Sequence, residues 1–214
     1  MAAMRPFVIV NCAMTADGKI AGRSRRQLRI SSGEDLERVQ SLRASSDAIL
    51  VGVGTILADD PHLTAKGAPA GKTPLRIVLD SNGRTPDEAK VLDGTAPTLI
   101  ATADGSSKTW SGAEVLRCGS GRVDLGILLA ELHRRGVRTL LVEGGGEVVW
   151  SFFSGGFVDR YCVFVGNILV GGSTSPTPVD GEGFPDDETV VLKIVEVRRL
   201  GSGVLLCYEV VEDD

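Results

Sequence analysis

Short apolar runs, separated by polar segments that contain turn residues, recur along most of the chain. The runs are rich in Val, Ile and Leu and lie at residues 7–13, 48–53, 75–80, 98–103 and 139–143. Uninterrupted runs of this length are typical of β-strands that are buried on both faces. We therefore expect a central sheet with other elements packed on both sides.

Two helices are predicted between these strands. Residues 33–44 follow a pair of serines that can cap a helix, and they carry Leu36, Val39 and Leu42 at three- and four-residue spacing. Residues 123–135 end in basic side chains directly before a glycine. Strands that alternate with helices predict an α/β fold with a mostly parallel central sheet.

The end of the chain changes character. Strand-like segments at 159–165, 189–200 and 204–211 follow one another without helices, and a Gly-Ser-Gly turn joins the last two. We therefore expect antiparallel C-terminal strands. Residues 171–189 are polar and rich in proline and glycine, which indicates a long loop. We expect one domain over residues 1–214.

Composition excludes several classes of function. The net charge of −5 argues against nucleic acid or an anionic membrane as a partner. The four cysteines are scattered, and only two histidines could assist them, so we expect reduced thiols and no metal site. The first apolar run is too short for a signal peptide or a membrane span, and we expect a cytosolic protein.

A Gly-x-Gly segment follows the second predicted strand. Gly52 and Gly54 would let the backbone approach a phosphate group, and Asp59 and Asp60 come shortly after them. The third glycine of a dinucleotide fingerprint would fall at Leu57, so a standard Rossmann site is excluded. A phosphate loop and a tight strand-to-helix turn both remain open.

A run of glycines follows the strand at 139–143. Gly144, Gly145 and Gly146 open a predicted helix, and this arrangement favours an anionic ligand. Close packing of the turn is the structural alternative. Glu143 precedes the glycines at the carboxyl end of the strand, the edge where open α/β sheets bind ligands.

Cations are concentrated in one segment of this acidic chain. Lys19, Arg23, Arg25, Arg26 and Arg29 occur without an intervening acid. The segment could attract a phosphorylated ligand or could be an ordinary solvated loop.

The turn at 80–84 raises a similar choice. Ser81 and Arg84 could bind the 2′-phosphate of a dinucleotide, but Asn82 and Gly83 also suit a plain β-turn.

Several motifs occur together in a fixed order and at matching intervals. They lie at residues 11–19, 29–32, 42–44, 51–55, 57–64, 76–81, 143–146 and 180–184. In these motifs the chain resembles the stand-alone archaeal 2,5-diamino-6-ribosylamino-4(3H)-pyrimidinone 5′-phosphate reductases of riboflavin synthesis. It also resembles the reductase domain of the bacterial bifunctional deaminase-reductases. The resemblance covers nearly the whole chain.

The resemblance implies a dihydrofolate-reductase-like fold, a homodimer, a phosphorylated pyrimidine substrate and NADPH as the cofactor, with NADH as the alternative. By resemblance the cofactor residues are Ala13, Thr55, Asp59, Asp80, Ser81, Asn82, Gly83, Gly144, Gly145, Gly146 and Glu147. The substrate residues are Gln27, Arg43, Leu63, Lys66 and Glu143. Among these we expect catalytic roles for Asp59, as the proton donor, and for Glu143, at the donor edge of the pyrimidine.

Two positions depart from the bacterial pattern. Lys66 replaces an arginine and Arg29 replaces a tryptophan, and both changes fit the stand-alone type. The His-x-Glu and Pro-Cys-x-x-Cys segments of a zinc deaminase are absent from the sequence, so we expect reduction to precede deamination. A dihydrofolate reductase and a non-catalytic nucleotide sensor are the alternatives.

Overall fold

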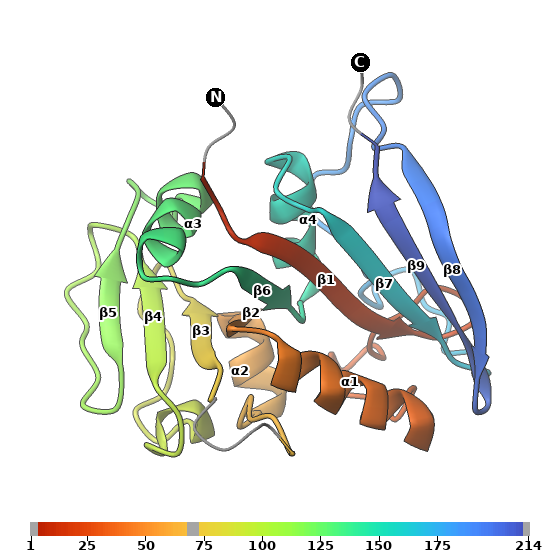
Figure 1. Cartoon of the computed structure of the whole chain (residues 1–214), viewed down its shortest axis with the longest axis horizontal. Coiled ribbons are helices and arrows are strands. Elements are labelled where there is room, and N and C mark those ends of the chain that lie inside the picture. Colours follow the sequence, from red (N-terminus) through yellow and green to blue (C-terminus); the bar gives the residue numbers. More distant parts are fainter. Residues whose placement is uncertain (1–3, 68–72, 212–214) are drawn as a thin grey trace. The chain divides into compact units, whose positions relative to one another are not determined.

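The computed structural model describes residues 4–67 and 73–211 (Figure 1). The chain divides into two compact units. Unit 1 comprises Met1–Phe7 and Gln40–Leu141, and unit 2 comprises Val8–Val39 and Val142–Asp214. The single domain expected from the sequence stays a prediction.

Unit 1 is built on strands in the order β5-β4-β3-β2-β6. β2, β3, β4 and β5 pair in parallel, each with its neighbour in this order. Every residue of β2 and β4 is buried, because apolar side chains alternate between two covered faces. The strands are β2 (Ala48–Gly52), β3 (Leu75–Leu79), β4 (Thr98–Thr102), β5 (Glu114–Arg117) and β6 (Thr139–Val142).

The helices of unit 1 are α2 (Val53–Asp59), the 3-10 helix η1 (Lys90–Leu92) and α3 (Leu125–Arg134). Asp124 caps α3, since its carboxylate accepts a hydrogen bond from the backbone N–H of Ile127 at 3.0 Å. The predicted helix at 123–135 is therefore confirmed.

Unit 2 combines one parallel and two antiparallel pairings. β1 (Phe7–Met14) runs parallel to β7 (Arg160–Val165). β9 (Gly203–Val210) pairs antiparallel with both β7 and β8 (Leu192–Leu200). The predicted antiparallel end and its hairpin turn are confirmed, although β8 begins three residues later than residue 189.

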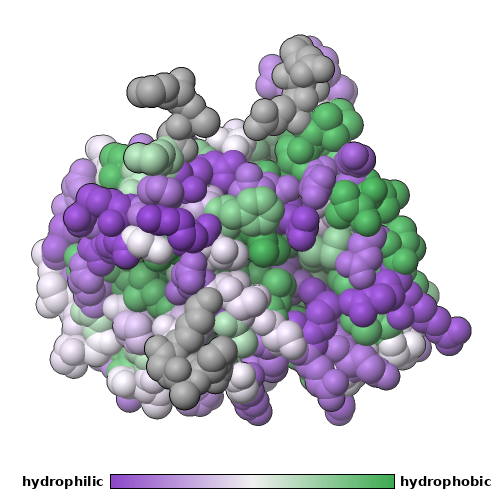
Figure 2. Space-filling view, viewed as in Figure 1, coloured by the Kyte–Doolittle hydropathy of each residue, from purple (hydrophilic) through white to green (hydrophobic). Residues whose placement is uncertain are grey.

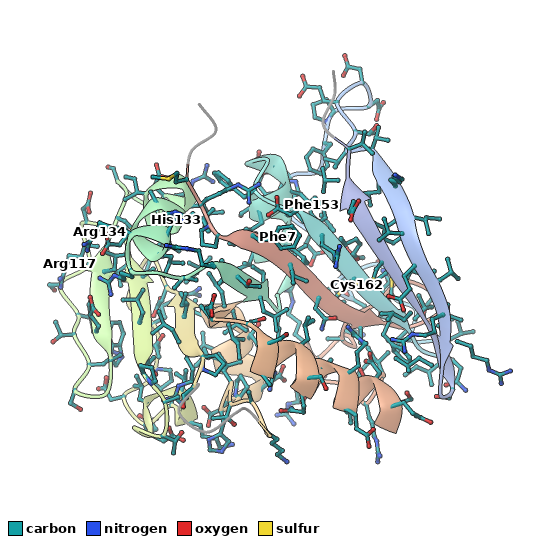
Figure 3. All side chains as sticks on the ribbon, viewed as in Figure 1. Phe7, Arg117, His133, Arg134, Phe153 and Cys162 are labelled. Atoms are coloured by element: carbon teal, nitrogen blue, oxygen red, sulfur yellow. A yellow bond between two sulfur atoms is a disulfide. The ribbon has the colours of Figure 1, made fainter. Side chains whose placement is uncertain are left out.

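Helix α4 (Gly146–Ser154) packs its aromatic side chains against β7. Phe152 is fully buried, and Phe153 meets Tyr161 edge to face with ring centroids 5.5 Å apart (Figure 3). The predicted helix after the glycines is therefore confirmed.

Helix α1 (Gly33–Ser45) is present as predicted and capped by Ser32, whose hydroxyl accepts a hydrogen bond from the backbone N–H of Asp35 at 3.2 Å. The predicted apolar face is wrong at Leu36, which is 49% exposed. Asp35 is buried instead and accepts a 2.8 Å hydrogen bond from Arg38, which also donates to Asn11. The buried side chain in this turn of the helix is therefore the polar Asp35, with Arg38 as its partner, and not Leu36 as the apolar spacing predicted.

The expectation of reduced thiols is wrong for one pair of cysteines. Cys162 of β7 and Cys207 of β9 form a disulfide (Figure 3). They are register partners on adjacent antiparallel strands, although 45 residues separate them in sequence. Sequence spacing gave no sign of the pair because strand pairing brings the two residues together.

We predict that the unfolded, unreduced protein exposes only the thiols of Cys12 and Cys118, and that all four cysteines react after reduction. Closing a loop of this length stabilises a protein by about 4 kcal/mol, so a reductant should lower the melting temperature. Thiol titration and thermal melts measure both effects. The Cys162→Ala/Cys207→Ala variant is the control, and four reactive thiols before reduction would contradict the prediction.

Candidate functional site

In unit 1 the Gly-x-Gly segment is the junction between β2 and α2. Gly52 precedes the first helical residue in an extended conformation, with φ −80° and ψ 156°. Thr55 and Asp59 are four positions apart on α2, so they lie on one face of the helix. Both are partly exposed. The tight turn that the sequence left open is present, and two predicted cofactor residues share one face beside it.

The turn after β3 is organised from inside by Asp80. Its carboxylate is fully buried and accepts hydrogen bonds from the N–H of Arg84 at 2.9 Å and from the N–H and hydroxyl of Thr85 at 2.7 Å. Gly83 has a φ of +69°, which favours glycine. Asp80 therefore shapes the turn, and Ser81 and Asn82 remain partly or fully exposed on it.

The segment after α2 brings three predicted substrate residues together. Arg43 donates a 3.3 Å hydrogen bond to the carbonyl of Thr64, the residue that follows the buried Leu63. The N–H of Lys66 donates to the side chain of Gln40 at 2.8 Å, one helical turn before Arg43. Arg43, Leu63 and Lys66 thus belong to one cluster in unit 1.

In unit 2 the glycine run joins Glu143 to α4. Gly144 has a φ of +107°, and a Cβ added there would meet no protein atom within 4 Å. At Gly146 a Cβ would lie 2.5 Å from the carbonyl oxygen of Thr177 and 2.7 Å from a carboxylate oxygen of Asp180. Gly146 is therefore required by close packing, whereas Gly144 leaves open space at the start of the helix.

Glu147 is exposed in the first turn of α4. The other predicted residues of unit 2 lie on β1 and in the loop that follows it. Ala13 is the register partner of Phe164 and is half-buried, and Gln27 is exposed in a short bridge with Ala21. Of the basic segment, Lys19 donates to the carbonyl of Ser175 at 3.3 Å. The other cations of the segment are exposed: Arg23, Arg25, Arg26 and Arg29.

Asp17 ties this loop to the segment after β7. Its carboxylate accepts hydrogen bonds from the hydroxyl of Thr15 at 2.6 Å and from the N–H groups of Gly171 and Val170 at 2.6 and 3.1 Å. These donors, the Thr15 hydroxyl above all, lower the pKa of Asp17 to about 2. The anchor is consequently charged across the physiological range.

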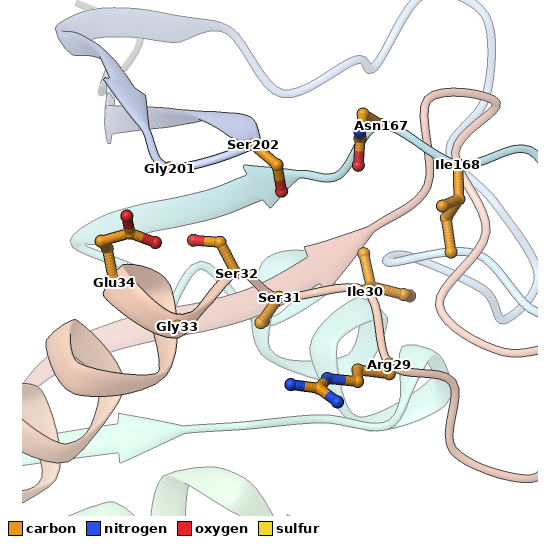
Figure 4. A pocket seen from close by; sticks show the side chains of 10 residues that line it. All are labelled: Arg29, Ile30, Ser31, Ser32, Gly33, Glu34, Asn167, Ile168, Gly201 and Ser202. Atoms are coloured by element: carbon orange, nitrogen blue, oxygen red, sulfur yellow. The ribbon is translucent and has the colours of Figure 1, made fainter.

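A hollow of about 430 Å³ opens at the N-terminus of α1 in unit 2 (Figure 4). Arg29 is the cation in its lining, and Glu34 adds a carboxylate. The lining is Arg29, Ile30, Ser31, Ser32, Gly33, Glu34, Asn167, Ile168, Gly201 and Ser202.

Sequence reasoning missed the fully buried side chain of Arg76 on β3. Its guanidinium is 2.9 Å from the carboxylate of Asp93, and it also donates to the carbonyl of His62 at 3.2 Å. A charged residue inside an apolar strand was the available signal, because a buried arginine needs partners.

Within the described residues, no group of three or more His, Cys, Asp and Glu side chains could hold a metal ion. No helix in residues 4–67 or 73–211 is both long and apolar enough to cross a membrane.

The family model described as the RibD C-terminal domain matches residues 6–206. The 2,5-diamino-6-ribosylamino-4(3H)-pyrimidinone 5′-phosphate reductase of Archaeoglobus fulgidus is 46% identical, over 94% of this chain and 96% of the relative. The reductase of the same name from Methanothermobacter thermautotrophicus is 41% identical, over 97% of this chain and 99% of the relative.

Solved structures show the same fold. Acinetobacter baumannii RibD matches with a TM-score of 0.84 at 22% identity, over 99% of this chain and 59% of that one. The Saccharomyces riboflavin biosynthesis reductase Rib7 matches with a TM-score of 0.79 at 22% identity, over 99% of this chain and 92% of that one. The expected dihydrofolate-reductase-like α/β fold is confirmed.

Proposed function

Because the chain belongs to the RibD C-terminal domain family, we propose that it reduces 2,5-diamino-6-ribosylamino-4(3H)-pyrimidinone 5′-phosphate with NADPH in riboflavin biosynthesis. The observation that carries this proposal is the match of nearly the whole chain to stand-alone reductases of that name. Both relatives carry the diamino compound in their names, which supports this compound as the substrate here. The cytosolic location stays a prediction.

The reaction adds a hydride and a proton to the opened ribosylamino group. Bound NADPH supplies the hydride, which adds to C1′ of the sugar and leaves a ribitylamino group. The attached nitrogen takes the proton. The protein therefore has to bind the 5′-phosphate, align C1′ and deliver one proton.

The predicted cofactor residues fit a dinucleotide chemically. Gly144 leaves open space at the start of α4, where backbone N–H groups and the helix dipole favour a phosphate. In the turn after β3 the hydroxyl oxygen of Ser81 accepts a 3.0 Å hydrogen bond from the N–H of Val123, which leaves the O–H to donate. The exposed Arg84 follows, and a hydroxyl donor with a guanidinium favours a 2′-phosphate. These features support NADPH over NADH. We assign the cofactor to Ala13, Thr55, Asp59, Asp80, Ser81, Asn82, Gly83, Gly144, Gly145, Gly146 and Glu147.

For the substrate, the cluster of Arg43, Leu63 and Lys66 supplies two cations and a buried apolar side chain. We assign the 5′-phosphate to Arg43 and Lys66. Glu143 is only partly buried, and we assign its carboxylate to the N–H groups of the pyrimidine. Gln27 completes the proposed set as an exposed amide.

The expected homodimer is supported by an apolar face on the β8–β9 hairpin, where hydrophobic residues gather in Figure 2. Ile194 and Val197 of β8 are 57% and 63% exposed. Their register partners Tyr208 and Leu206 are partly exposed. We propose that a second copy of the chain covers this face, because a two-fold contact buries the same patch twice. A monomer mass by light scattering would contradict this proposal.

The overall reaction is tested by incubating the protein with NADPH and the ribosylaminopyrimidine phosphate. We expect the nicotinamide absorbance to fall, and to fall more slowly with NADH. Oxidation with dihydrofolate alone would indicate a dihydrofolate reductase instead. Binding of NADPH without oxidation by either substrate would indicate a sensor.

Replacing Arg43 with alanine should raise the KM for the pyrimidine phosphate by about tenfold or more, because a charged hydrogen bond to the phosphate is lost. The KM for NADPH should change much less. Arg134→Ala is the matched control, since Arg134 is an exposed arginine that pairs with Glu131. Equal effects on both KM values would contradict the phosphate role of Arg43.

Replacing Asp59 with asparagine should lower kcat by about 100-fold if Asp59 delivers the proton. The amide keeps the size of the side chain but cannot act as an acid. Asp87→Asn removes a carboxylate with 78% side-chain exposure and should leave kcat unchanged. An unchanged kcat with a raised KM for NADPH would make Asp59 a binding residue only.

A further inference from the structure

Arg76 is the largest of the fully buried side chains in the described chain, and it carries a charge. Its guanidinium donates to the hydroxyl of Thr98 at 2.9 Å, to the carbonyl of Ala96 at 2.6 Å and to the carboxylate of Asp93 at 2.9 Å. A further hydrogen bond of 3.2 Å reaches the carbonyl of His62. An apolar residue would cost less to bury in a strand, so the arginine requires an explanation other than packing.

The bond to His62 ends in the segment 60–64, whose backbone is unusual. Asp60 and Leu63 have φ values of 43° and 51°, in the left-handed region that residues other than glycine rarely adopt. Such a conformation persists only where surrounding contacts determine it. Leu63 is also buried although it lies in a loop.

Asp93 connects the arginine to the same segment by a second route. One carboxylate oxygen accepts from Arg76, and the other lies 3.0 Å from Nδ1 of His62. The hydroxyl and N–H of Thr95, followed by Arg76 and His62, hold the pKa of Asp93 well below its usual range. Arg76 thus contacts the backbone of His62 directly and its side chain through Asp93.

We propose that Arg76 is a positioning residue for the substrate site, which fixes the segment 60–64 through Asp93 and the His62 carbonyl. The proposal rests on the assignment of Leu63 and Lys66 to the substrate. Arg43 holds the far end of the segment at Thr64, and the N–H of Lys90 holds its near end at the carboxylate of Asp60. Arg76 contacts the middle of the segment at the carbonyl of His62, which lies between the left-handed residues Asp60 and Leu63.

A matched pair of variants separates positioning from stability. Arg76→Met removes both routes to the segment, and Thr98→Val removes a bond to the same guanidinium that does not reach it. Both should lower the melting temperature. Only Arg76→Met should raise the KM for the pyrimidine phosphate, by about tenfold or more. An unchanged KM in Arg76→Met, or an equal rise in Thr98→Val, would overturn the proposal.

Hydrogen exchange gives a readout that does not depend on the reaction. Amides in 60–66 should exchange faster in Arg76→Met than in the natural protein, and Thr98→Val should leave them unchanged. If the natural protein does not reduce the substrate, the proposed function fails, and exchange still tests whether Arg76 fixes the segment. If Arg76→Met does not fold, Asp93→Asn replaces it, and unchanged exchange in that variant overturns the proposal.

Discussion

Burial of strands on both faces is the constraint on which unit 1 depends. Strands such as β2 and β4 have no exposed residue, so they offer no position for a polar group that must meet a ligand. Contacts with a ligand are therefore left to the helices and to the segments that follow the strands. Gly52 and the start of α2 follow β2, and the turn of Ser81 follows β3. Both segments begin at the carboxyl ends of the neighbouring parallel strands β2 and β3.

Buried polar groups give these segments fixed shapes. Arg76 lies on β3 and Asp80 directly follows it. The guanidinium and the carboxylate both form hydrogen bonds with the backbone or the side chains of loops. The cost of burying a charge is offset only when all of its bonds are made. The same strand thus anchors two loops to which ligand roles are assigned.

Much of the fold was predictable from the sequence because apolar runs and helix signals are local. The runs at 48–53, 75–80 and 98–103 became β2, β3 and β4 with errors of one residue at their ends. β5 was missed because its four residues, Glu114–Arg117, are only partly apolar and lie at the edge of the sheet order. α2 remained one of two alternatives, because it begins directly after Gly52 without a side-chain cap.

The site was predictable only as a set of motifs. Motif order carried the assignment of Ser81, Arg43 and Glu143, whereas the contacts of Arg76 depend on segments far apart in the chain. The same limit explains Leu36, where helical spacing could not reveal that Asp35 has Arg38 as its partner. Pairings of this kind are decided by tertiary structure rather than by local pattern.

The disulfide between β7 and β9 has a consequence for the integrity of the chain. It closes a covalent ring that contains β8 and the whole loop 166–191. Loops of this length are preferred sites of proteolysis. A cut there would nick the protein without releasing its last strands, and the two fragments would separate on a denaturing gel only after reduction.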